Sequence, residues 1–249
     1  MAFPNDPDRS LLSVVVPAYN ERPTIAEQLR RVAVTPFEKE IIVVDDGSND
    51  GTREYLSAVA SGEERILDGN GRAVPIRVIF QTSNQGKGAA LRRAFAEVDG
   101  DIVLVQDADL EYDPRDYEAL VSPILDGVAD VVYGSRFLGR PQRVHLFWHS
   151  VGNRALTLLS NALNNLNLTD METGFKVFRR EVIDAIGPTL RSNRFGIEPE
   201  ITAKVARGGY RVYETPVAYH GRDYCGGKKI TWRDGVAAVY HVVRFRVAD

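Results

Sequence analysis

Five short apolar runs in the first 135 residues constrain the fold of this chain more than any other feature. They are LSVVVP (12–17), KEIIVVDD (39–46), IRVIFQ (76–81), DIVLVQ (101–106) and DVVYGS (130–135). Each run is continuously apolar rather than alternating, which is typical of parallel strands covered on both faces. Amphipathic segments such as TIAEQLRRVAV (24–34) and GAALRRAFAEV (88–98) separate them. The repeated strand–helix spacing predicts an α/β fold with a mostly parallel, doubly wound sheet flanked by helices.

The second half of the chain is less regular but continues the same architecture. Residues 150–168 are expected to form a helix and residues 174–180 a short strand. A helix over 197–209 should end at the glycine pair 208–209, because glycine is the usual residue at a helix C-terminus. Residues 210–220 favour a bent strand or strand pair, and residues 231–247 a final amphipathic helix.

Composition excludes several classes of protein. A formal net charge of −3 gives no basic excess, so a nucleic-acid partner is not expected. The single cysteine, Cys225, rules out an internal disulfide framework and suits a reducing compartment. The N-terminal segment MAFPNDPDRS has no apolar core of a signal peptide, and no apolar run reaches about 18 residues. We therefore expect a cytoplasmic protein without a transmembrane helix.

Residues that bear chemistry follow three of the predicted strands. The first strand leads into PAYNE (17–21), the second into DDGSNDGT (45–52) and the fourth into DADLE (107–111). Ligands of open α/β sheets bind beyond the carboxyl ends of the strands, so these segments should converge on one site. No G-x-G-x-x-G follows the first strand and no G-x-x-x-x-G-K-[ST] is present, which excludes a dinucleotide-binding or P-loop site.

The carboxylates after the fourth strand suggest a hard cation. Asp107 and Asp109 would point to the same side if the strand continued that far, with Glu111 as a third ligand. Mg²⁺ is typically held by one or two carboxylates together with substrate phosphates. The alternative is a solvated strand end without a ligand.

The other two strand ends and the glycine-containing segment NQGKGAA (84–90) also allow two interpretations. In the functional one, Tyr19 lies against a base or ribose, Glu21 and Asp46 accept hydrogen bonds from it, and Lys87 assists where the backbone approaches a phosphate. In the structural one, PAYNE starts a helix, Asp50 caps the next helix, and the glycines form a tight turn.

Taken in order, VVVPAYNE, IIVVDDGSNDGT, NQGKGAALRRAF, QDADLEYDP and VVYGSRF resemble the family 2 glycosyltransferases of the GT-A fold. The segments 150–182 and 198–222 resemble the branch with dolichyl-phosphate mannosyl- and glucosyltransferases and bacterial polyprenyl-phosphate relatives. The similarity covers roughly residues 10–246. It implies one GT-A catalytic domain over 1–249, with a nucleotide-sugar half over about 10–135 and an acceptor half over about 136–249.

The resemblance also implies an activity and a set of site residues. The activity is inverting transfer of a sugar from GDP-mannose or UDP-glucose to a polyprenyl or dolichyl phosphate, with Mg²⁺ or Mn²⁺. Glu111 stands where relatives often have Gln or another polar ligand. The implied nucleotide-sugar contacts are Pro17, Ala18, Tyr19, Glu21, Asp46, Lys87, Gly88, Asp107, Ala108 and Asp109, and the metal ligands Asp107, Asp109 and Glu111.

Cations for the two phosphate groups are expected from the second half. Arg136 is a candidate for the acceptor phosphate, because a guanidinium fork suits phosphate oxygens. Relatives close an R-x-x-G-x-S-K loop over the donor diphosphate. Arg222 matches its arginine, but this chain has one more residue and Lys228-Lys229 in place of Ser-Lys, so Lys228 is a weaker candidate. With Asp109, Arg136 and Arg222 form the expected catalytic set. Asp170 and Glu172 either assist the acceptor site or cap neighbouring segments.

An isoprenoid acceptor would bring the chain to a membrane surface. Its final helix combines apolar residues such as Val239 and Val243 with Arg244 and Arg246, which fits either an interfacial or a core-packing helix. Peripheral association with the cytoplasmic face, or anchoring by a membrane protein partner, is the expectation. Two other functions stay open: transfer to a hydroxyl of a saccharide or small molecule, and non-catalytic binding of a nucleotide sugar.

Overall fold

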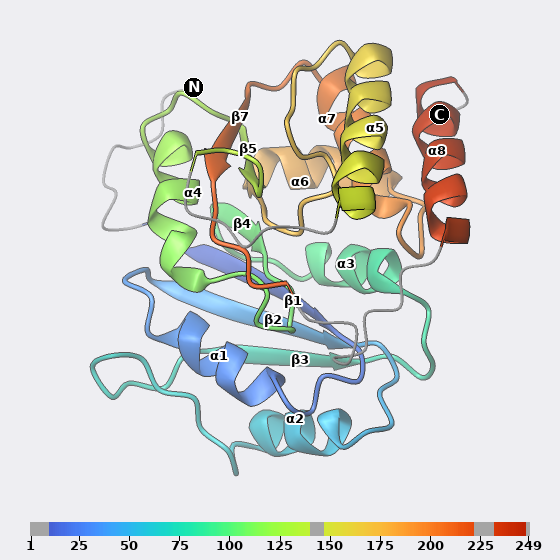
Figure 1. The fold of residues 1–249 in the computed structure, drawn as a ribbon. Coiled ribbons are helices and arrows are strands. Elements are labelled where there is room, and N and C mark those ends of the chain that lie inside the picture. Colours follow the sequence, from blue (N-terminus) through green and yellow to red (C-terminus); the bar gives the residue numbers. More distant parts are fainter. Residues whose placement is uncertain (1–9, 140–146, 222–231, 248–249) are drawn as a thin grey trace.

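The computed structural model describes residues 10–139, 147–221 and 232–247, and a seven-stranded sheet lies at its centre (Figure 1). The strand order is β3-β2-β1-β4-β6-β5-β7, and all pairs are parallel except those made by β6. The prediction of a mostly parallel sheet is therefore confirmed. The strands are β1 (Leu12–Ala18), β2 (Lys39–Asp45), β3 (Ile76–Phe80), β4 (Ile102–Val105), β5 (Val131–Ser135), β6 (Lys176–Arg179) and β7 (Val212–Pro216).

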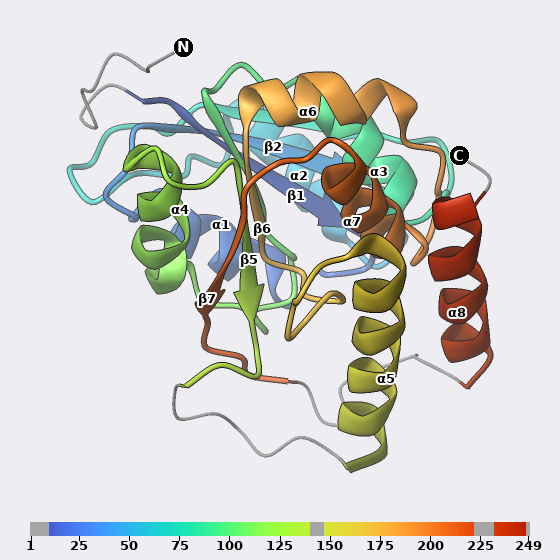
Figure 2. The same cartoon turned by 90° about the horizontal axis from the view of Figure 1, so that it is seen from above.

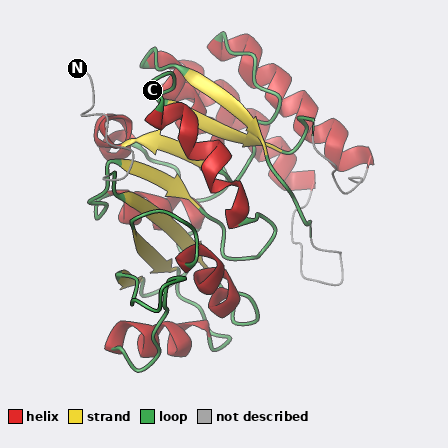
Figure 3. Ribbon diagram, turned by 90° about the vertical axis from the view of Figure 1, so that its left-hand side faces the viewer, coloured by secondary structure: helices red, strands yellow, loops and turns green. Residues whose placement is uncertain are grey.

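Helices cover both faces of this sheet, which is seen as one layer of strands in Figure 3. One face carries α1 (Ile25–Ala33), α2 (Thr52–Ser61) and α4 (Tyr117–Leu125), and the other carries α3 (Lys87–Phe95), α6 (Arg180–Ile186) and α7 (Ile197–Arg207). Helices α5 (Phe147–Asn164) and α8 (Trp232–Val247) lie side by side on the outside of α7 (Figures 1 and 2). Two short 3-10 helices, Pro114–Asp116 and Gly187–Thr189, complete the described elements.

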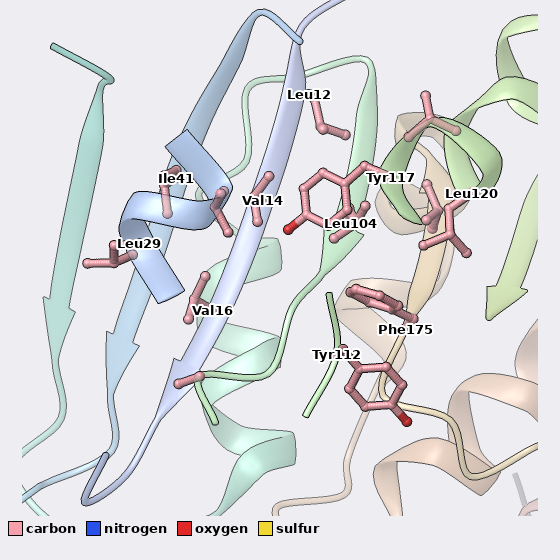
Figure 4. Packing of buried hydrophobic residues seen from close by; sticks show 14 of the residues in the cluster. Leu12, Val14, Val16, Leu29, Ile41, Leu104, Tyr112, Tyr117, Leu120 and Phe175 are labelled. Carbon is pink, nitrogen blue, oxygen red and sulfur yellow. The ribbon is translucent and has the colours of Figure 1, made fainter. Parts of the chain in front are cut away.

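The alternation of side chains along the strands separates two apolar clusters. Val14 and Val16 of β1 point to the α1 and α4 side, where Tyr117 and Phe175 fill the core (Figure 4). Val15, between them, points to the opposite cluster beneath α3 and α6. All five side chains are almost fully buried, and burial of each such group stabilises the fold by roughly 1.5–3 kcal/mol. Burial on both faces explains why the strands read as continuous apolar runs.

The antiparallel strand β6 brings the second half of the chain to the site. Val105, the last residue of β4, pairs with Lys176, the first residue of β6. Because the two strands run in opposite directions, the segment before β6 lies at the carboxyl end of β4. The approach is close, since a Cβ added to Gly174 would lie 2.2 Å from Oδ2 of Asp107.

The glycines of NQGKG are required by protein packing. A Cβ on Gly86 would lie 2.4 Å from the carbonyl oxygen of Asn193, and one on Gly88 would lie 2.3 Å from that of Ser192. Gly86 also has a φ of +102°, which side chains rarely adopt. Close packing against the backbone of residues 192–194 therefore explains both glycines, and an approach of Gly88 to a phosphate or ribose stays a prediction.

We predict that Gly88→Ala lowers the free energy of unfolding by about 1–3 kcal/mol, because the added methyl group overlaps a backbone carbonyl that cannot move cheaply. Gly152→Ala is the matched control. It lies on the exposed side of α5 with nothing within 4 Å of its added Cβ, and it should stabilise the protein by about 0.5–1 kcal/mol. Urea unfolding of both variants measures the difference. Equal effects of the two substitutions would contradict the packing role of Gly88.

Candidate active site

The DADLE segment forms a turn rather than an extension of the strand. Strand β4 ends at Val105, and Leu110 has a φ of +64°, a strained conformation for a leucine. The prediction that strand alternation aligns Asp107 with Asp109 is therefore wrong in its geometry. The turn instead presents both side chains, partly exposed, at the carboxyl edge of the sheet. Oδ1 of Asp109 also accepts a hydrogen bond from the backbone N–H of Glu111 at 3.0 Å.

Lys87 joins two carboxylates from distant parts of the chain. Its Nζ lies 2.8 Å from Oδ1 of Asp107 and 3.1 Å from Oε1 of Glu198, at the start of α7. Burial would lower the pKa of Lys87, but the charges of Asp107 and Glu198 outweigh it and hold that pKa well above its ordinary value. A lysine so placed stays charged and fixes the position of Asp107. Its expected contact with a phosphate or ribose stays a prediction.

Two of the three predicted metal ligands, Asp107 and Asp109, could hold a cation jointly with a substrate, and the role of Glu111 as a third ligand stays a prediction. Asp107 and Asp109 offer hard carboxylate oxygens at one edge, the donor type that Mg²⁺ and Mn²⁺ prefer. Glu111 points its Oε2 at the hydroxyl of Tyr219, which donates to it at 2.6 Å. Across the residues that the structure describes, no three His, Cys, Asp or Glu side chains are grouped to hold a metal by themselves. The site thus supplies two carboxylates, and the phosphates of a ligand would complete the coordination.

The loops after β1 and β2 are joined by hydrogen bonds. The backbone N–H of Glu21 donates to Oγ1 of Thr52 at 2.9 Å, and the carboxylate of Glu21 accepts from Oγ1 of Thr24 at 2.7 Å. Asp50 accepts from the backbone N–H of Thr52, which confirms its predicted capping role. Tyr19 beside them is 41% exposed and forms part of an open surface. Nucleoside binding by Pro17, Ala18, Tyr19 and Glu21 stays a prediction that this arrangement permits.

Asp46 has a different task from the one expected. Its carboxylate accepts four hydrogen bonds, from the side chains of Gln81 and Asn84 and from the backbone N–H groups of Gln85 and Gly86, at 2.7 to 3.0 Å. A carboxylate has about four lone-pair sites, so these donors use its capacity. The structure thus shows Asp46 holding the loop before α3, and its hydrogen bonds to a base or ribose stay a prediction.

Arg136 is held rigidly at the end of β5. Its Nε and Nη2 donate to the two carboxylate oxygens of Asp170 at 2.7 and 2.8 Å, and its guanidinium lies 5.2 Å from the ring centre of Tyr219. Burial would raise the pKa of Asp170, but Arg136 outweighs it and keeps that pKa below its ordinary value. Asn153 of α5 donates to the same carboxylate. Asp170 thus positions Arg136, and its predicted assistance to an acceptor site stays a prediction.

Two groups with shifted pKa values lie near this arginine, the half-buried Glu172 and the buried Lys176. Burial raises the pKa of Glu172 to about 7, and Glu198 adds to the shift. Burial also lowers the pKa of Lys176, to about 8, against the opposing charge of Glu198. Nζ of Lys176 donates to the carbonyl of Met171 at 3.1 Å, whereas Oε1 of Glu172 is buried without a hydrogen-bond partner among the described residues. The second half therefore contributes a carboxyl group whose pKa is raised by burial and an amine whose pKa is lowered by burial.

Glu172 should make stability depend on pH in a defined window. Its folded pKa of about 7 exceeds the ordinary value of 4.5, so the native state binds the extra proton between these values. Its contribution is complete below pH 4.5 and is lost as pH rises to 7, with a slope of up to about 1.4 kcal/mol per pH unit. Urea unfolding of wild type and Glu172→Gln should therefore diverge across this window. Parallel curves would contradict the shift.

Several site residues were not identified from sequence, and some predicted ones lie outside the described part. Glu198, Lys176 and Tyr219 received no role in the sequence analysis, although a glutamate or lysine in an otherwise apolar element was an available signal. Arg222 and Lys228 both fall in 222–231, outside the described residues.

Comparisons with known proteins identify the family to which the chain belongs. Residues 13–187 match the family model described as glycosyl transferase family 2, and so span both halves of the chain. Glycosyltransferase AglD of Haloferax volcanii is 34% identical over 83% of this chain and 32% of its own length. Dolichol-phosphate mannosyltransferase of Pyrococcus furiosus is 31% identical over 84% of this chain and 56% of its own length. The chain thus spans a third to about half of these two relatives.

A relative of similar length and a set of solved structures extend the comparison. Undecaprenyl-phosphate mannosyltransferase of Micrococcus luteus is 27% identical over 94% of this chain and 93% of its own length. Glucosyl-3-phosphoglycerate synthase from Mycobacterium tuberculosis, solved with Mn²⁺, UDP and glucosyl-3-phosphoglycerate, has a TM-score of 0.65. The match covers 95% of this chain and 78% of that one at 23% identity, and so concerns the fold. The resemblance found in the sequence is confirmed.

Proposed function

Because the chain belongs to glycosyl transferase family 2, we propose that it moves a sugar from a nucleotide-diphosphate sugar to a polyprenyl or dolichyl phosphate. The proposed product is a polyprenyl-monophosphate sugar with an inverted anomeric centre. GDP-mannose and UDP-glucose are the proposed donors. The names of the Pyrococcus and Micrococcus relatives support the acceptor class.

The observation that carries the proposal is the meeting of a carboxylate pair with a rigid arginine. The two groups come from opposite halves of the chain and are connected by two tyrosines. Tyr112 lies between them, with its hydroxyl accepting from the backbone N–H of Gly174 at 2.8 Å and its ring 5.2 Å from that of Tyr219. Tyr219 in turn lies beneath the guanidinium of Arg136. A donor diphosphate at Asp107 and Asp109 and an acceptor phosphate at Arg136 would thus be held on either side of this tyrosine pair.

The chemistry needs positioning more than proton transfer. A phosphate monoester is anionic near neutral pH, so one of its oxygens can attack the anomeric carbon without a general base. The new carbon–oxygen bond forms as the bond to the diphosphate breaks, and the nucleoside diphosphate leaves with the electron pair. A divalent ion, when bound to Asp107 and Asp109, would neutralise charge on that leaving group. No hydrogen bond from Nη1 of Arg136 is formed within the described residues, which leaves this nitrogen available for an acceptor phosphate oxygen.

The location of the enzyme follows from the proposed acceptor. In the described part of the chain, no helix is long and apolar enough to cross a membrane. We propose peripheral association with the cytoplasmic face of a membrane, alone or through an anchoring partner. The sugar acceptor would then be reached from the bilayer surface.

A hydroxyl acceptor is the second candidate, and one observation favours it. Oε2 of Glu198 is buried without a hydrogen-bond partner among the described residues, and burial raises the pKa of Glu172 to about 7. Either carboxylate could accept the proton that a hydroxyl nucleophile must lose. A phosphate acceptor has no need of such a base.

Nucleotide release tests the proposal. The purified protein is assayed with Mg²⁺ or Mn²⁺ across GDP- and UDP-sugars, each with and without a short-chain polyprenyl phosphate. Release that requires one sugar nucleotide and the lipid phosphate, and that stops with EDTA, is expected. Release only with a hydroxyl acceptor would favour the second candidate. Nucleotide binding without turnover in any mixture would instead favour a binding module.

A further inference from the structure

A cavity lined by arginines lies outside the proposed transfer site. It has a volume of about 160 Å³ and is enclosed by the loop over 191–196 on one side and by the second half of α8 on the other. Three arginines line it: Arg191, Arg194 and Arg244. The loop is anchored on its other side, where the carbonyl of Asn193 accepts from the backbone N–H of Ala89 at 3.0 Å. The loop that lines the cavity thus packs against the start of α3, and none of the predicted nucleotide, metal or acceptor residues that the structure describes lines the cavity.

Two polar side chains in this cavity have unused hydrogen-bonding capacity. Ser192 is 8% exposed, and its Oγ is buried without a partner among the described residues. The same holds for Nδ1 of His241, whose ring is stacked on Phe245 with centroids 5.8 Å apart. The ring fits there because residue 196 is glycine, since an added Cβ would lie 2.8 Å from it. Buried polar atoms normally have partners, so these two atoms are available to a ligand or a water molecule that enters the cavity.

The charges around the cavity are predominantly positive. No salt bridge within the described residues involves Arg194 or Arg244. The facing carboxylate is Glu200, which is fully buried and already accepts from the backbone N–H groups of Arg191 and Ser192 at 2.8 and 2.7 Å. Lys204 lies 3.7 Å from the same carboxylate and offsets its charge. Arg194 and Arg244 can therefore pair with an anion that enters the cavity.

We propose that this cavity binds a phosphate group separate from the substrates of sugar transfer. Arg194 and Arg244 would supply the guanidinium donors and Ser192 a hydroxyl donor, which together match a tetrahedral anion. Both walls are firmly placed. The side chain of Arg207 in α7 donates to the carbonyl of Phe245, and this contact fixes α8 against the rest of the protein.

Two sources can supply a phosphate group here, a lipid headgroup and a free phosphate compound. The apolar surface beside the cavity suggests that a lipid headgroup should be tested as the source. Beside Arg244, α8 exposes Val239, Tyr240 and Val243, with exposed fractions of 44%, 61% and 43%. The adjacent helix α5 presents an exposed stripe of Trp148, Val151, Ala155, Leu158 and Ala162. Such an apolar surface next to arginines is typical of helices that lie on anionic lipid.

The test uses the full chain, inorganic phosphate and vesicles. Phosphate binding is measured by calorimetric titration of wild type, Arg194→Gln, Arg244→Gln and the control Arg246→Gln, an exposed arginine of α8 outside the cavity. Loss of one charged contact should weaken binding roughly tenfold in the two cavity variants and leave the control unchanged. Thermal unfolding verifies that every variant is folded.

Binding to vesicles distinguishes a lipid headgroup from a free phosphate compound. Co-flotation is compared for phosphatidylcholine vesicles with and without phosphatidylglycerol. If Arg194→Gln and Arg244→Gln also reduce flotation with the anionic vesicles, and Arg246→Gln does not, the ligand is a lipid headgroup. If they weaken phosphate binding alone, it is a free phosphate compound. Equal phosphate affinity in all four proteins, or no measurable binding to wild type, would overturn the proposal.

Discussion

Replacing Asp109 with asparagine should lower the rate of sugar transfer by at least about a hundredfold. The substitution keeps the size of the side chain and its hydrogen-bond acceptor toward the backbone N–H of Glu111. It removes the negative charge that would hold a divalent ion beside the donor diphosphate. Stability should change little, because Asp109 is partly exposed. Steady-state nucleotide release and urea unfolding measure the two effects separately.

Asp126→Asn is the matched control for this experiment. Asp126 is an exposed carboxylate at the end of α4, so the same chemical change there should leave activity unaltered. If Asp109→Asn retains full turnover while Asp126→Asn behaves as wild type, the carboxylate pair is not the donor site. In a binding module, Asp109→Asn would weaken nucleotide binding with no turnover to lose.

Arg136→Lys should also reduce the rate of transfer by roughly a hundredfold or more. Most of this loss should appear as a higher KM for the lipid phosphate. A lysine keeps the charge but cannot bind both oxygens of Asp170 and an acceptor phosphate in one plane. The aspartate is buried and would lose part of its bidentate pairing, so stability should fall as well. The informative quantity is therefore the KM for polyprenyl phosphate, compared with the KM for the sugar nucleotide.

Arg211→Lys controls for the loss of a bidentate arginine as such. Arg211 donates through Nε and Nη2 to the two oxygens of Asp130, but this pair is largely exposed and lies just before β7, at the opposite end of that strand from the site. Its replacement should leave both KM values unchanged. If Arg136→Lys raised the KM for the sugar nucleotide instead, Arg136 would belong to the donor side.

Most of the fold could be predicted from sequence because one physical signal repeats. Strands buried on both faces require continuous apolar runs, so β1 to β5 were located within one or two residues. The glycine pair Gly208–Gly209 likewise ends α7 as expected, with a φ of +68° at Gly209. The direction of β6 was not predictable, because a strand of only four residues carries no signal for its partner or orientation.

The position of the candidate site at the strand ends was predictable, but the ion pairs and hydrogen bonds between its residues were not. Asp107 and Asp109 follow an apolar run, so their place at the sheet edge could be inferred. The bridge from Lys87 to Glu198 joins residues more than a hundred positions apart, and only the folded topology brings them together. The hydrogen bonds of Asp46 could not be predicted either. The sequence around Asp46 gives no sign that residues 81–86 donate four hydrogen bonds to its carboxylate.

Mass spectrometry of the lipid product tests the central claim most directly. The protein is incubated with the sugar nucleotide that supports turnover, a short-chain polyprenyl phosphate and Mg²⁺, and the lipid fraction is analysed. We expect an acceptor heavier by one glycosyl group, with a single phosphorus atom, and NMR of the same product should show an anomeric configuration opposite to that of the donor. A lipid that gains a second phosphorus, or a sugar attached only to a hydroxyl group, would contradict it.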